Sequence, residues 1–181
     1  MKREDAYRLL REKLKNKNLF KHSLAVEACL KKMAQRFGED EEIWALTGLL
    51  HDIDYEETNA DPTRHGLQGA RFLEEAGFDG SLVRAVKVHS GHAAPESKLD
   101  WALFSTDPLT GLIVASALMH PEKKLDSLDV EFVVRRFKEK RFAAGANREQ
   151  IALCKNLGLN LEEFIEICLQ AMQGISGELG L

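Results

Sequence analysis

The chain of 181 residues is long enough for one ordinary domain, and its shares of hydrophobic (44%) and charged (30%) residues are typical of a soluble globular protein. A net charge of −4 gives no general attraction to nucleic-acid polymers or anionic membranes, so neither is expected as a partner. The longest uncharged apolar run, 111–119, is about half of what a bilayer requires, and the charged N-terminus has no signal-peptide core. We therefore expect a cytoplasmic protein.

In the first part of the chain, apolar residues recur with the helical period. This predicts an amphipathic helix over 3–15. Asn18 is expected to cap a second helix, which ends at Gly38, because these residue types favour those two positions. A third helix is predicted to start in the acidic stretch 39–42, as the helix dipole favours.

Asp61 followed by Pro62 is typical of a helix start, so a helix is expected from there to Gly77. Pro108 is expected to interrupt the helical pattern at Asp107, with one helix before it and another after it. The other expected elements are helices over 81–89, 97–106, 129–140, 148–157 and 160–174, and a loop over 91–95.

These elements predict an all-α fold of roughly nine helices in a single domain, 1–181. Within it we expect a metal-site core over 18–120, with the C-terminal helices of 121–181 packed on it. Apolar helix faces in the C-terminal third are compatible with a homodimer. The cysteines form no CxxC pair and lie among apolar residues, which favours reduced core residues over a zinc site; they are Cys29, Cys154 and Cys168.

The stretch 48–57, GLLHDIDYEE, places His51 and Asp52 where an apolar helical run ends. Imidazole and carboxylate are side chains that divalent transition metals accept readily. One such pair is weak evidence, and a single histidine is more often a core or surface residue. His120, beside Pro121, is assigned to that ordinary group.

The other histidines must be judged together, because they follow one another at intervals of about one helix and its connection. Each ligand would then come from a different helix, which is how helical bundles build metal sites. In order, the pattern is His22, His51-Asp52, His65, His89 and Asp107.

This order resembles the HD-domain superfamily of metal-dependent phosphohydrolases, whose signature is H…HD…H…H…D. The likeness covers about residues 18–120. A bacterial and archaeal subfamily of predicted hydrolases is similar over nearly the whole chain, in LLHDIDYE, in TDPLTGLIVAS (106–116) and in FKEKRFAAGANRE (137–149).

The resemblance implies that one metal is held by His22, His51, Asp52 and Asp107. In two-metal members Asp52 bridges, and the residues matching His65 and His89 hold the second ion, so one or two ions per chain are expected. Imidazole and carboxylate ligands suit Mn, Fe, Co, Ni or Zn better than Mg.

Further residues near this pattern are candidates for catalysis or substrate binding. His92 lies three residues after His89 and is a candidate ligand or proton donor, although Gly91 can break the helix between them. Asp54 and Glu56 are candidates to orient ligands, or form an exposed acidic turn. The candidate cations for a substrate phosphate are Arg64, Lys87, Lys138 and Arg141; for each, a solvated side chain is the alternative, and Lys87 is also considered catalytic.

The leading interpretation is a phosphohydrolase that cleaves a phosphoester of a small metabolite, a nucleotide being the preferred substrate, with Asp52 positioning a metal-activated water. One alternative is a mixed-valence di-iron oxygenase, since a few members of the superfamily use the same six ligands. Another is a non-catalytic metal-binding module. No GxxxxGK[ST] loop is present, which argues against a P-loop NTPase.

Overall fold

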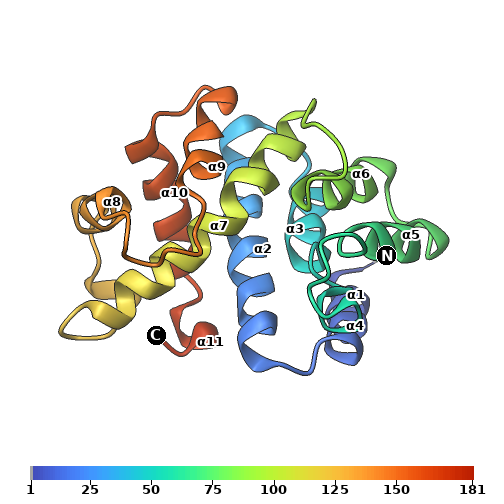
Figure 1. The fold of residues 1–181 in the computed structure, drawn as a ribbon, viewed down its shortest axis with the longest axis horizontal. Coiled ribbons are helices and arrows are strands. Elements are labelled where there is room, and N and C mark those ends of the chain that lie inside the picture. The colour runs from blue at the N-terminus through green and yellow to red at the C-terminus, as the bar shows by residue number, and fades with distance from the viewer. Residues whose placement is uncertain (1) are drawn as a thin grey trace.

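Helices α2 and α7 cross in the middle of the molecule, and the remaining helices pack on either side of this pair (Figure 1). The structure is a computed structural model and describes residues 2–181. Helices α1 and α3–α6 lie on one side and α8–α10 on the other. The elements are α1 (Arg3–Lys13), α2 (Lys17–Phe37), α3 (Glu41–Leu50), α4 (Tyr55–Thr58), α5 (Leu67–Glu75), α6 (Gly80–His89), α7 (Lys98–Met119), η1 (Leu125–Ser127), α8 (Val130–Lys138), α9 (Arg148–Ala152), η2 (Leu153–Leu157), α10 (Leu161–Gln173) and α11 (Ser176–Leu179).

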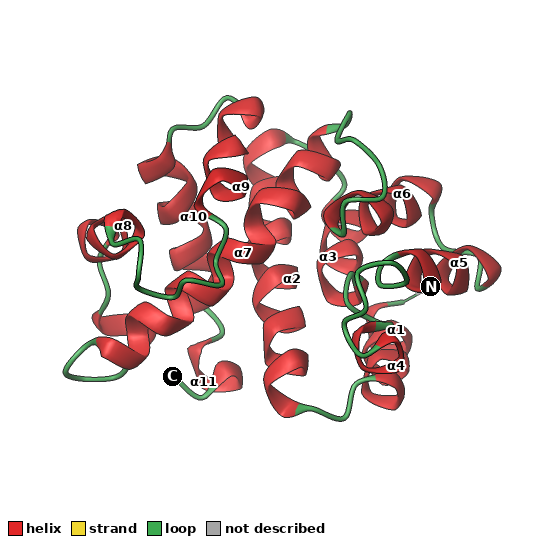
Figure 2. Ribbon diagram, in the orientation of Figure 1, coloured by secondary structure: helices red, strands yellow, loops and turns green. Residues whose placement is uncertain are grey.

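The all-α prediction is confirmed, since residues 2–181 contain helices, turns and loops and no strand (Figure 2). Helices α4 and α11 are single turns of four residues, and the other α-helices match the expected number of roughly nine. The helices after residue 120 pack on α2 and α7.

One connected set of buried apolar side chains runs from Ala6 in α1 to Leu179 in α11. Among its largest members are Leu30, Leu103 and Phe164, each fully buried. Burial of such a side chain contributes about 1.5–3 kcal/mol to folding. All three cysteines lie in this set as free thiols, as expected, and burial raises the pKa of Cys154 to about 11.

Gly48 allows α3 to lie directly against α2. A Cβ atom at this position would lie 2.7 Å from the backbone of Val26 and Glu27, which is closer than real Cβ contacts. The carbonyl oxygen of Gly48 also accepts a hydrogen bond from His51. Gly48 therefore both permits the close packing of the two helices and orients the ring of His51.

Two predicted helix starts were wrong. Asn16, not Asn18, caps α2, because its side chain accepts from the amides of Asn18 and Leu19. Helix α5 begins at Leu67 rather than after Asp61, because Gly66 adopts φ +79° and breaks the preceding turns.

The predicted interruption at Pro108 was also wrong, since α7 is one helix of 22 residues. Proline removes the hydrogen bond to the carbonyl four residues earlier, which here belongs to Phe104. The side-chain amide of Gln150 in α9 donates to that carbonyl at 2.7 Å instead. A contact from a distant helix therefore compensates for the lost bond.

By length and composition alone, α7 is also a candidate membrane span. It packs against α2, α6, α8 and α9, and 56% of its most apolar window is buried inside the protein. Core helices of globular proteins pass the same test, so this is weak evidence for a span.

Candidate metal centre

The structure brings the six predicted ligand residues together between α2, α3, α6 and α7. His51 and Asp52 directly follow α3, and His65 lies in the turn before α5. The others lie within helices: His22 in α2, His89 at the end of α6, and Asp107 in the middle of α7.

One half of the cluster consists of His22, His51 and Asp107. The Nε2 atoms of the two histidines are 3.2 Å apart. Oδ1 of Asp107 lies 3.0 Å from Nε2 of His22 and 3.8 Å from Nε2 of His51. Oδ2 of Asp52 faces the same two Nε2 atoms, at 3.7 and 3.5 Å.

The other half consists of His65 and His89, whose Nε2 atoms are also 3.2 Å apart. Oδ1 of Asp52 lies 3.3 Å from Nε2 of His65 and 3.4 Å from Nε2 of His89. The two oxygens of Asp52 thus face opposite halves, which is the arrangement of a bridging carboxylate.

These separations fit ligands that share an ion. Two nitrogens bound at 2.0–2.1 Å to one ion lie roughly 2.9–3.4 Å apart for octahedral to tetrahedral angles. Two groups of three ligand atoms lie within 4.8 Å of one another: His22 with His51 and Asp107, and His51 with Asp52 and His89. His51 belongs to both groups, so it borders both halves.

The second ring nitrogen of every histidine in the cluster is hydrogen-bonded. Nδ1 of His51 donates to the carbonyl of Gly48 at 2.8 Å, and Nδ1 of His89 donates to the carbonyl of Val86 at 2.6 Å. Nδ1 of His65 donates to Oδ1 of Asp54 at 2.8 Å.

Thr110 holds the remaining ring, that of His22. Its hydroxyl donates to the carbonyl of Asp107 at 3.0 Å, which leaves its oxygen free to accept from Nδ1 of His22 at 3.1 Å. All four histidines therefore carry hydrogen on Nδ1. Their Nε2 lone pairs converge on one another and on carboxylates, an arrangement that a cation between them stabilises.

The electrostatics of the cluster agree with a cation site. Burial by itself would lower the pKa of His51, but the charges of Asp52 and Asp107 raise it to about 9. Burial acts in the same direction on His65, whose pKa Asp52 and Asp54 raise to about 10. Burial would raise the pKa of Asp107, yet His22 and His51 hold it below its usual range. The carboxylates thus attract positive charge to this place, as protons or as metal.

Asp54 links the cluster to the fold of α5. Besides Nδ1 of His65, its carboxylate accepts the amides of Gly66 at 2.8 Å and Gly69 at 2.6 Å, at the start of α5. Burial would raise the pKa of Asp54, but these partners lower it. Asp54 is therefore not part of an exposed acidic turn, and its bond to His65 agrees with the prediction that it orients a ligand. Glu56 instead accepts from the amides of Lys15 and Asn16, away from the cluster.

Several predicted site residues lie elsewhere. His92 does not join the ligands: Gly91, at φ +86°, turns the chain, and Nε2 of His92 donates to the carbonyl of His65 at 3.0 Å. Lys87 faces a separate hollow with Phe78 and Arg84 that no ligand residue lines.

The remaining predicted cations are also outside the cluster. Arg64 is exposed and donates to Gln68. Lys138 and Arg141 are exposed, and within residues 2–181 neither pairs with a cluster residue. In the same segment, Arg148 donates to carbonyls of the loop 139–147, which gives FKEKRFAAGANRE a structural role.

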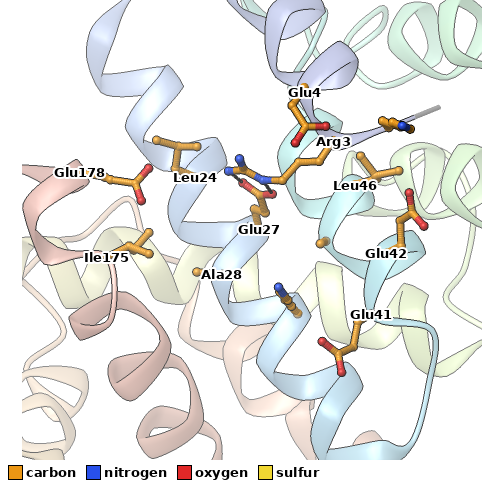
Figure 3. Close-up of a pocket in the computed structure, with 13 residues that line it drawn as sticks. Arg3, Glu4, Leu24, Glu27, Ala28, Glu41, Glu42, Leu46, Ile175 and Glu178 are labelled. Atoms are coloured by element: carbon orange, nitrogen blue, oxygen red, sulfur yellow. Dashed lines mark hydrogen bonds and ion pairs between the residues drawn. The ribbon is translucent and has the colours of Figure 1, made fainter.

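A cavity of about 690 Å³ lies away from the cluster, between the start of α1, helices α2 and α3, and α11 (Figure 3). Its side chains meet in an ion pair in which Nε of Arg3 lies 2.5 Å from Oε1 of the buried Glu27. This pair fastens α1 to α2, and the cavity contains none of the six ligand residues.

Together, the helical fold and the histidine–aspartate cluster define an HD-type metal-site protein, and the chain belongs to the HD domain family, which it matches over residues 19–124. It is similar to the Uncharacterized protein MJ0778 of Methanocaldococcus jannaschii, with 29% identity over 83% of this chain and 91% of that protein.

The chain is also similar to proteins named Ribonuclease Y. Identity is 30% to that of a Sulfurovum species, over 51% of this chain and 18% of the relative. Identity is 25% to that of Desulfotalea psychrophila, over 81% of this chain and 31% of the relative. The chain thus corresponds to less than a third of these two ribonucleases. No solved structure gave a significant match.

Proposed function

We propose that this protein is a metal-dependent phosphohydrolase that cleaves a phosphoester of a small metabolite, with two divalent transition-metal ions held by the cluster. The observation that carries the proposal is that four Nε2 lone pairs, each fixed by a hydrogen bond at Nδ1, converge on the two oxygens of Asp52. Membership of the HD domain family supports the same chemistry.

In this proposal His22, His51 and Asp107 would hold one ion, His65 and His89 would hold the other, and Asp52 would contribute to both sites. When bound, such ions polarise a phosphoryl oxygen and generate a nucleophile from water at neutral pH. Asp52 has one oxygen on each side, so it is placed to orient the attacking water. The exposed side-chain fractions of His22 (23%) and Asp107 (28%), against 0% for His51, mark the face from which a phosphoryl group approaches.

The substrate proposal combines the sequence expectation with the relatives. A nucleotide stays the prediction from sequence, and the relatives named as ribonucleases support hydrolysis at phosphorus. The test panel therefore contains nucleoside monophosphates, cyclic dinucleotides, a short RNA and simple alkyl phosphates.

The first measurement is the metal content of untagged protein by plasma mass spectrometry, for wild type and His65→Ala. We expect about two ions per chain, falling toward one in the variant. His120→Ala is the matched control and should retain both, because His120 contacts Phe132 rather than the cluster. Absence of metal from wild type after reconstitution would refute the proposal.

The second measurement is phosphate release by the metal-loaded protein under anaerobic conditions. Release from a member of the panel, lost in Asp52→Asn, supports the hydrolase. Oxygen uptake by an iron-loaded protein without phosphate release would instead favour the di-iron oxygenase, which uses the same ligands.

A further inference from the structure

A groove of about 430 Å³ runs between α2 and α7 and borders the cluster at one proposed ligand, His22. At its inner end it is lined by His22 and by Thr110, the residue that holds the ring of His22. From there it extends to Leu118 and to the C-terminal residues 179–181. In Figure 1, α11 lies beside α2, and the C-terminus lies near the last turns of α7.

The walls of the groove come from single faces of the two helices. On α7, Gly111, Val114 and Leu118 follow Asp107 at spacings of four, three and four residues, so one face leads from the metal ligand outward. On α2, Ala25 continues the face of His22. The α2 face thus includes a proposed ligand, His22, and the α7 face begins one turn after another, Asp107.

Gly111 keeps the groove open. It is exposed on α7, and a Cβ atom added to it would meet nothing within 4 Å. A larger side chain at this position would enter the groove rather than clash with the core. Leu118, further along the groove, is 52% exposed, so apolar surface is available here for a ligand.

The chemistry of the lining selects the occupant. Its apolar residues are aliphatic: Ala25, Val114, Leu118, Leu179 and Leu181. Among the described residues that line the groove, His22 carries the only aromatic ring, and Nδ1 of this ring is already bonded to Thr110. Lys21 lies at the edge, with its Nζ close to Gly180. Five aliphatic side chains outnumber the polar side chains of Asn18, Lys21 and Thr110, so the walls are mainly apolar and favour an aliphatic chain.

We infer that this groove binds the aliphatic part of a phosphoester whose phosphoryl group lies at the metal centre, so that the substrate is an alkyl-type phosphate. The inference rests on the proposed function for the location of the phosphoryl group. The walls formed by α2, α7 and α11 then select substrates by the length of their alkyl chain.

The test uses n-alkylphosphonates with two, four, six and eight carbons, titrated calorimetrically into the metal-loaded protein. These probes are not hydrolysed, so binding is measured without turnover. Affinity should rise about fourfold for each methylene that enters the groove, and at least about thirtyfold from ethyl to octyl. An affinity that does not depend on chain length, or tighter binding of a nucleoside monophosphate than of octylphosphonate, would overturn the inference.

Two variants locate the effect. In Gly111→Leu, and separately in Leu118→Asn, the increase in affinity from ethylphosphonate to octylphosphonate should fall at least tenfold. The Gly111→Leu variant should fold, since leucine favours a helix more than glycine does. The control Glu131→Leu adds the same side chain to an exposed position on α8 and should keep the full gain. An unchanged gain in both groove variants would overturn the inference.

Phosphate release from octyl phosphate separates the two proposals. A chain-length effect on binding, without release from octyl phosphate or from any member of the panel, would refute the hydrolase and leave the groove established. Release from short and long chains at equal kcat/KM, with no effect on binding, would retain the hydrolase and reject the groove.

Discussion

His22 differs from His51 and His89 in how its ring is held, because its acceptor is a side chain. The hydroxyl of Thr110 is both the acceptor for Nδ1 and a donor to the carbonyl of Asp107, another proposed ligand. One threonine thereby connects two ligands of the same half. Residues that orient metal-binding histidines typically contribute 10–100-fold to metal affinity.

We therefore expect Thr110→Val, which keeps the shape but removes the acceptor, to weaken binding of one ion by about 10–100-fold. The other ion, next to His65 and His89, should be little affected. Metal titration followed by calorimetry measures both steps. Thr110→Ser keeps the hydroxyl and should restore binding; if Ser and Val behave alike, the hydrogen bond has no orienting role.

Asp54 holds the ring of His65 as Thr110 holds that of His22, because its carboxylate accepts from Nδ1 of His65. Asp54→Asn should weaken binding of the second ion by about 10–100-fold. It should also destabilise α5, since the amides of Gly66 and Gly69 lose a charged acceptor. Asp61→Asn removes a carboxylate that accepts from Thr63 within its own turn; it is the control and should leave metal affinity unchanged. Metal content after dialysis against a weak chelator distinguishes the two variants.

At the residue scale, sequence reasoning found the residues that meet in the cluster because their spacing matches one ligand per helix. It missed Thr110, whose signal was its position three residues after Asp107 on α7. It placed His92 and Lys87 near the site because both are close to His89 in sequence. Gly91 and the direction of α6 send them elsewhere, and neither effect is visible in spacing alone.

At the scale of elements, α7 depends on α9 for one hydrogen bond beside a proposed metal ligand. Gln150→Met should leave the carbonyl of Phe104 without a partner and lower the free energy of unfolding by about 1 kcal/mol. In a Pro108→Ala background the backbone amide of residue 108 can donate to the carbonyl of Phe104. Gln150→Met should then lower the free energy of unfolding much less. Urea unfolding of the four proteins measures this coupling, and additive effects would contradict it.

The contact of α2 with α3 gives a second prediction at this scale. Gly48→Ala forces a Cβ atom against the backbone of Val26 and Glu27, so we expect a loss of about 1–3 kcal/mol in stability. It should also weaken metal binding, because His51 directly follows α3 and is bonded to the carbonyl of Gly48. Gly145→Ala, where an added Cβ meets nothing within 4 Å, is the matched control and should not destabilise in this way.

Element types could be predicted from periodicity, but some boundaries could not. Helix α5 receives its N-terminal acceptor from Asp54, twelve residues before Gly66, so no local cap marks its start. The continuity of α7 through Pro108 depends on Gln150, which lies 46 residues after Phe104. Both are long-range compensations that a local pattern does not contain.

At the scale of the whole molecule, the cluster connects five segments between His22 and Asp107. A bound ion should stabilise the fold, by about 2.7 kcal/mol at a hundredfold excess over its Kd. Its removal by a chelator should therefore lower Tm measured by calorimetry. His65→Ala should show a smaller drop than wild type, since it has one proposed site fewer.

The decrease in Tm on metal removal should depend on pH. Because folding raises the pKa of His51 to about 9 and of His65 to about 10, protonation stabilises the metal-free protein at low pH. This contribution is complete below the ordinary histidine pKa of about 6.5 and is lost as pH rises through about 9–10. Protons also compete with metal at low pH. The difference in Tm between loaded and stripped protein should thus grow from about pH 6.5 to about pH 10, and a constant difference would contradict this.

The way the four rings are held has a consequence for how such a protein diverges. In each half, one ring is held by a backbone carbonyl of its own helix, Gly48 or Val86, which no side-chain substitution removes. The other ring is held by a replaceable side chain, Thr110 or Asp54. A single mutation can therefore adjust the affinity of either ion separately while every ligand is kept. Descendants of this chain could move between two-ion and one-ion forms in small steps.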